Sequence, residues 1–152
     1  MFTSLTSACL LLCAAEPEKP AGAMPALPAL AADAPPLRKA QLELVREGLA
    51  YLKRTQDLVK ADAWVPSDFR YFAEVLAETC RAAAELEEKP ANRVAWFEAR
   101  VGRLKEAERL IDRVARRGVV APRDLNLIRF QRIQAEVDLL RLREEAEKAG
   151  RK

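Results

Sequence analysis

Hydrophobic residues recur at three- and four-residue steps along most of the chain after residue 36, which is the spacing of one face of an α-helix. Four stretches of this kind predict helices over residues 37–61, 66–88, 91–117 and 122–149. Short breaks rich in Pro, Gly, Asp and Asn separate them, and such residues interrupt helices. We therefore predict an all-α fold.

Two of the predicted helices show the pattern especially clearly. The second has nearly strict heptad spacing, through Phe69, Phe72, Leu76, Thr79, Ala83 and Leu86. The fourth has two adjacent apolar seams: one is Leu125, Ile128, Ala135, Leu139 and Leu142, and the other is Phe130, Ile133, Val137 and Leu140. A helix with so wide an apolar surface is suited to contact more than one neighbouring helix.

The turn between the third and fourth helices has residues typical of a helix stop followed by a helix start. Gly118 can adopt the left-handed conformation that closes a helix. Pro122 suits the first position of the next helix, and Asp124 then lies in the first turn among unpaired N–H groups. We interpret Asp124 as a helix-capping residue rather than an acid/base catalyst.

A weaker copy of this turn joins the first two helices, where Pro66 and Asp68 take the places of Pro122 and Asp124. The two turns predict two antiparallel helical hairpins, 37–88 and 91–149, forming an elongated four-helix bundle or coiled coil. Both turns would then lie at the same end of the bundle. The apolar residues there are a candidate partner-binding tip, made of Trp64, Val65, Val119 and Val120.

The segment from Gly118 to Asp138 resembles the periplasmic hairpin turn of TolC-type outer-membrane efflux proteins. The matching residues are Gly118, Asp124, Leu125, Gln134 and Ala135, with Pro66, Asp68 and Phe69 as a weaker second copy. The resemblance implies a coiled-coil hairpin in the cell envelope that packs with a similar hairpin on another protein. Family members are much longer and have membrane-spanning β-strands, so we expect no pore from this chain.

The first 36 residues differ in composition from the rest. Residues 1–15 have no charged side chain and end in Cys-Ala-Ala, which predicts a signal peptide and a periplasmic or extracellular location. Leu12 before Cys13 argues against a lipid anchor. Residues 16–36 hold six prolines among alanines, which predicts a disordered N-terminal segment that serves as a semi-rigid linker. No run is long and apolar enough for a membrane span.

The net charge of +3 is unevenly distributed, since residues 91–152 hold 16 basic and 10 acidic side chains and have a net charge of +6. These charges alternate in sign at helical spacing, which is typical of a solvated helix face. We therefore expect no nucleic acid partner. A basic helical nucleic-acid-binding protein is the alternative if the N-terminus is not a signal.

The chain has no histidine, which excludes a His-based triad and the commonest metal ligand. Cys80 is predicted to be a small buried residue, with an intermolecular disulfide as the alternative. Arg129 and Arg132 are expected to extend from the seam edge to water, and Gly102 to mark a close-packing point. We predict a scaffold or interaction protein that is not an enzyme and needs no cofactor or metal. Its expected partner is a protein or a second copy, bound through helices.

Overall fold

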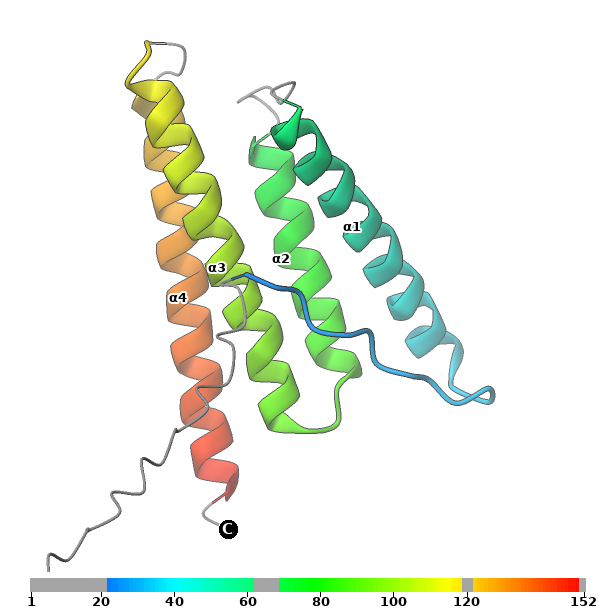
Figure 1. The fold of residues 1–152 in the computed structure, drawn as a ribbon. Helices are drawn as coiled ribbons and strands as arrows, with labels where there is room; N and C mark the ends of the chain where they lie inside the picture. The colour runs from blue at the N-terminus through cyan, green and yellow to red at the C-terminus, as the bar shows by residue number, and fades with distance from the viewer. Residues whose placement is uncertain (1–21, 62–68, 119–121, 151–152) are drawn as a thin grey trace, which may run out of the picture.

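The computed structural model describes residues 22–61, 69–118 and 122–150, and the regular secondary structure of this part is helical, without strands. It contains four helices: α1 (Pro36–Lys60), α2 (Phe69–Leu86), α3 (Pro90–Ala115) and α4 (Pro122–Gly150). The predicted all-α class is confirmed, and the helix boundaries agree with the predicted ones to within three residues (Figure 1).

Each helix packs against the next one in the chain: α1 on α2, α2 on α3, and α3 on α4, while α2 touches α4 only slightly. Neighbouring helices run in opposite directions, and α1 and α4 lie at the two edges of the row (Figure 1). The two central helices therefore have neighbours on both sides, and the two edge helices each have a side without a helical neighbour.

Proline and glycine set the helix ends. Pro36 and Pro90 each occupy the first turn of their helix, where a missing N–H removes no intrahelical hydrogen bond. Helix α3 ends at Ala115, two residues earlier than predicted, because Arg117 and Gly118 donate to carbonyls only three residues back, at 3.1 Å and 2.9 Å. Gly118 has a φ of 73°, which confirms the predicted left-handed helix stop.

The core lies along α2 and α3, the two helices with neighbours on both sides. Its largest fully buried side chains are Trp96, Phe69, Leu76, Leu104, Ile111, Ile128 and Val45. Burying one such side chain contributes about 1.5–3 kcal/mol. The indole N–H of Trp96 donates to Glu87 Oε1 at 3.2 Å, so this buried polar group is satisfied at the corner where α2 meets α3.

Residues 22–35 do not form a free tether, which corrects the prediction of a disordered linker for this part. They run across the helices to the start of α1, with a turn in which Ala34 N donates to Ala31 O at 3.0 Å (Figure 1). Met24 and Leu30 pack against the core, and the Gly22 backbone lies against α3 at Gly102. The prolines exclude helix as expected, and Gly22, Ala23 and Pro25 line a shallow hollow together with Ala99 and Gly102 of α3.

Candidate functional site

The whole predicted tip lies outside the described residues, with Trp64 and Val65 at the first turn and Val119 and Val120 at the second. The predicted capping residues Pro66 and Asp68 lie outside them as well. The tip as a contact surface therefore stays a prediction. Pro122 begins α4, and Asp124 lies in its first turn as predicted, with one oxygen 3.7 Å from Arg123 Nε.

Helix α4 has two apolar faces, one buried in the core and one exposed. The first predicted seam faces the core: Ile128 and Ala135 are fully buried and Leu139 is 8% exposed. The second seam points away from it. Phe130 is 62% exposed, Ile133 52% and Leu140 57%, while Val137 between them is half-buried. We call Phe130, Ile133, Val137 and Leu140 the α4 seam.

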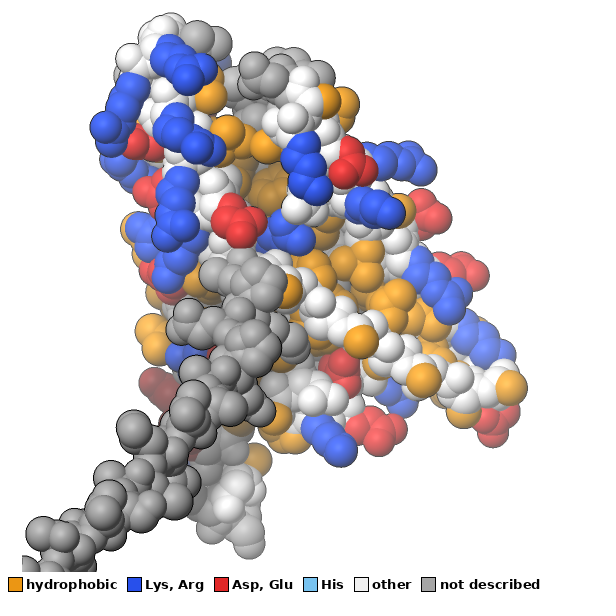
Figure 2. Space-filling view, viewed as in Figure 1, with side chains coloured by type: hydrophobic (Ala, Val, Ile, Leu, Met, Phe, Trp, Pro, Cys, Tyr) orange, Lys and Arg blue, Asp and Glu red, His pale blue; other side chains and the backbone are white. Residues whose placement is uncertain are grey.

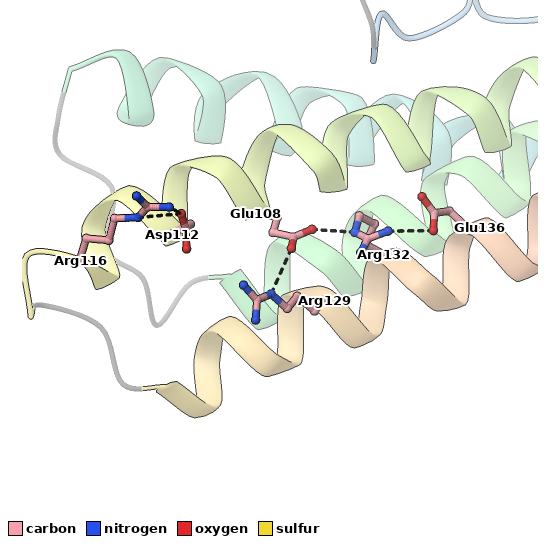
Figure 3. Close-up of polar contacts among 6 residues, drawn as sticks. All are labelled: Glu108, Asp112, Arg116, Arg129, Arg132 and Glu136. Atoms are coloured by element: carbon pink, nitrogen blue, oxygen red, sulfur yellow. Dashed lines mark hydrogen bonds and ion pairs between the residues drawn. The ribbon is translucent and has the colours of Figure 1, made fainter.

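Ion pairs between α3 and α4 border the α4 seam on one side and fix how α4 is rotated (Figure 3). Glu108 of α3 accepts hydrogen bonds from Arg129 Nε at 3.2 Å and from Arg132 Nε at 2.6 Å. Arg132 also donates to Glu136 at 2.8 Å, and Lys105 Nζ of α3 lies 3.1 Å from the same carboxylate. Arg129 and Arg132 thus keep 48% and 23% of their side chains exposed at the seam edge, and Glu108 holds both guanidinium groups there.

This network shifts the pKa values of two of its members. The hydrogen bond to Glu108 raises the pKa of the Arg132 guanidinium, and the bond to Glu136 adds to it, although burial opposes both. Burial by itself would raise the pKa of Glu136, but hydrogen bonds from Lys105 and Arg132 outweigh it and lower that pKa. Both side chains are therefore ionised at neutral pH and hold α3 against α4.

Two further ion pairs join α3 to α4. Arg100 donates to Asp138 at 2.9 Å, and its side chain is only 8% exposed. Arg143 donates to Glu98 at 2.6 Å on the surface. Many basic residues of the second half are thus paired with carboxylates within the fold, while the excess of basic over acidic residues in this half remains.

Helix α1, at the other edge, has a less continuous apolar surface. Leu37, Leu44 and Leu58 are 70%, 51% and 46% exposed and follow heptad spacing. Charged Glu47 and Arg54 lie between them, so only one apolar residue recurs per seven. An apolar seam requires two apolar residues per heptad. Among the described helices, α4 has two such residues per heptad on an exposed face.

A groove of about 250 Å³ lies between α1 and α3, over Phe72 of α2. Its walls are apolar, with Leu52 and Val59 from α1 and Leu110 from α3, and Arg103 and Arg113 stand at its rim. Figure 2 shows hydrophobic side chains in this hollow and a gathering of Lys and Arg side chains around the neighbouring end of α3. The groove is open to solvent.

Cys80 is fully buried in α2, which confirms the prediction of a small buried residue. Burial raises the pKa of its thiol from 9.0 to about 12, and the charges of Arg100 and Arg103 offset only part of that rise. In the described ranges, no group of three His, Cys, Asp or Glu side chains is placed to hold a metal ion. No described helix combines the length and apolarity needed to cross a membrane.

Comparisons with protein-family models, with curated protein sequences and with solved structures found no match to this chain. The α4 seam is therefore identified as a candidate contact surface by its exposure and by the neighbouring ion pairs alone.

Proposed function

We propose that this protein is a helical interaction module, a scaffold rather than an enzyme, that binds a protein partner through the α4 seam. One observation supports this most directly: three large apolar side chains, Phe130, Ile133 and Leu140, are each more than half exposed on one helix face. Contiguous exposed apolar surface of this kind marks interaction sites in soluble proteins. Helix α4 is already held rigid by α3, so little ordering cost opposes binding.

The proposal includes the cell envelope as its location, with residues 1–15 acting as a signal peptide. It also includes an arrangement of two antiparallel hairpins in one elongated unit, similar to the periplasmic hairpin of TolC-type proteins. The left-handed Gly118 and the position of Asp124 in the first turn of α4 support the resemblance at that turn. The apolar tip would be a second contact surface.

Site-specific photo-crosslinking in the native cell tests the contact surface. A photoreactive phenylalanine at Phe130 probes the seam, and the same group at Tyr71 of α2 is the matched control, since these aromatic side chains are 62% and 65% exposed. We expect a crosslinked protein from position 130, none from position 71, and loss of the product when Ile133→Glu is added. Equal products from both positions would exclude the seam as a specific surface.

Cell fractionation with mass spectrometry of the native N-terminus tests the export part separately. We expect the protein in the envelope fraction without its first 15 residues. A cytoplasmic protein that retains them would refute export and leave the contact surface unaffected.

A further inference from the structure

The α4 seam has the spacing of a coiled-coil contact rather than of a general apolar patch. Its four residues follow one another at steps of three, four and three, from Phe130 through Ile133 and Val137 to Leu140. These are two consecutive heptads with both core positions apolar. Such a stripe fits a helix that runs nearly parallel or antiparallel to α4, and it does not fit a flat or irregular partner surface.

Charges on the two sides of the seam select the direction of the partner helix if that helix is α4 of a second copy. In a parallel pair, Glu136 of each copy faces Arg141 of the other, which is attractive on both sides. In an antiparallel pair with all four seam residues in contact, Arg129 would face Arg143 and Glu136 would face its own equivalent. Those contacts bring like charges together and add no attraction to the pairs that Arg129, Arg143 and Glu136 already make with α3, so charge complementarity favours the parallel pair.

We propose that two copies of this chain associate through the α4 seam, with their α4 helices side by side and parallel. This inference rests on the proposed function and names the partner of the same surface. Each seam residue then contacts its own equivalent across a two-fold axis, which closes the assembly at two copies. Val137 and Leu140 occupy the two core positions in the order that favours two-stranded coiled coils.

The dimer is expected to be weak, because two heptads form a short interface. We expect dissociation in the micromolar range, measured by sedimentation velocity of the full chain over a concentration series up to about 100 µM, where such a dimer predominates. Ile133→Glu should weaken association by about tenfold or more, since it places a charge in the seam. Leu44→Glu on α1 is the matched control, because Leu44 is 51% exposed against 52% for Ile133.

Disulfide trapping tests the direction. Glu144 and Asn126 are exposed and continue the seam by four residues beyond each end. In a chain with Cys9→Ser and Cys13→Ser, the single variant Glu144→Cys should form a disulfide dimer under mild oxidation if the helices are parallel. An antiparallel pair would instead link Glu144→Cys to Asn126→Cys in a mixture of the two variants.

The outcomes separate this inference from the proposed function. A chain that stays monomeric at about 100 µM, or that dimerises equally well with Ile133→Glu, overturns the inference. If position 130 still crosslinks another protein in the cell, the proposed interaction module stands without self-association. Trapping only in the mixed antiparallel arrangement overturns the parallel geometry.

Discussion

Gly48 of α1 lies directly against Thr79 of α2, and the two helices approach each other closely at this point. A methyl group placed on Gly48 would overlap Thr79 Oγ1 and would lie 3.0 Å from its Cβ and 3.1 Å from its Cγ2. Both residues are buried, and Thr79 is only 2% exposed. The absence of a side chain at position 48 therefore sets the distance between α1 and α2.

We predict that Gly48→Ala destabilises the protein, although Ala is the better helix former. Helix propensity alone would stabilise by about 1 kcal/mol, but forcing a methyl group into a packed contact costs about 1–3 kcal/mol. The measurement is urea unfolding followed by far-UV circular dichroism. Gly150→Ala is the control, because a Cβ there meets nothing within 4 Å, and it should leave stability unchanged or slightly higher.

A double-mutant cycle identifies the cause. Thr79→Ala removes Oγ1 and Cγ2, the atoms that crowd position 48 besides Cβ. The variant with both Gly48→Ala and Thr79→Ala should be more stable than the sum of the single effects predicts, by about 1 kcal/mol. Strict additivity would show that the crowding at this contact does not determine the effect.

The Arg100–Asp138 pair should contribute far more to stability than the Arg143–Glu98 pair, although both join α3 to α4. The Arg100 and Asp138 side chains are 8% and 26% exposed, and the Arg143 and Glu98 side chains 48% and 50%. Asp138→Leu leaves a buried charge without its partner and should cost about 2–4 kcal/mol. Glu98→Leu removes an exposed partner and should cost less than about 1 kcal/mol.

The same comparison has an internal check. Adding Arg100→Met to Asp138→Leu removes the unpaired charge, and also Arg100 Nε, which has no hydrogen-bond partner among the described residues. The double variant should therefore be more stable than Asp138→Leu alone. A double variant that is less stable would mean that Arg100 acts mainly through the packing of its aliphatic part.

Local sequence patterns were sufficient to predict the helices and the two apolar seams of α4. Periodicity depends only on residues three or four apart, and Gly118 and Pro122 mark their turn without help from the rest of the chain. The pattern could not tell which α4 seam is buried. Ile128 and Phe130 look equally suited to a core, and the choice depends on how α4 is rotated against α3.

Contacts between distant residues were missed for the same reason. Glu108 binds Arg129 and Arg132, which are 21 and 24 residues away in the sequence. The spacing of residues within one helix therefore could not predict these ion pairs. The packing of Met24 and Leu30 was also missed, because a Pro/Ala-rich composition describes backbone preference and not the apolar surface available to it.

Gly22→Ala should release residues 22–35 from the helices. Gly22 has a φ of 86°, and a Cβ there would lie 3.1 Å from backbone atoms of Gly102 and Arg103. Gly118→Ala is the matched control, since its φ of 73° imposes similar strain with nothing within 4 Å. Limited proteolysis should cut residues 22–35 much faster in Gly22→Ala than in Gly118→Ala, and equal rates would contradict the packing.

The Glu136 network should lose its stabilising effect in acid. The pKa of Glu136 is lowered in the folded protein from its ordinary 4.5, so the folded state favours the ionised carboxylate. Its contribution is present above pH 4.5 and disappears as the pH falls through the lowered value. The gap in Tm between wild type and Glu136→Gln should therefore narrow from about pH 5 to about pH 3. Glu147→Gln, at an exposed position of α4, controls for the loss of one negative charge.

Cys80 should be unreactive in the folded protein despite being a free thiol. Burial raises its pKa to about 12, so at pH 8 the thiol is almost entirely protonated, and the thiolate is the reactive form. In a chain with Cys9→Ser and Cys13→Ser, Ellman's reagent should react with Cys80 only as fast as the protein unfolds, and at once in denaturant. Adding Glu43→Cys on α1 to that chain supplies an exposed thiol as the internal standard, which should react within the mixing time. Equal rates for the two thiols in the folded state would mean that α2 opens locally at Cys80.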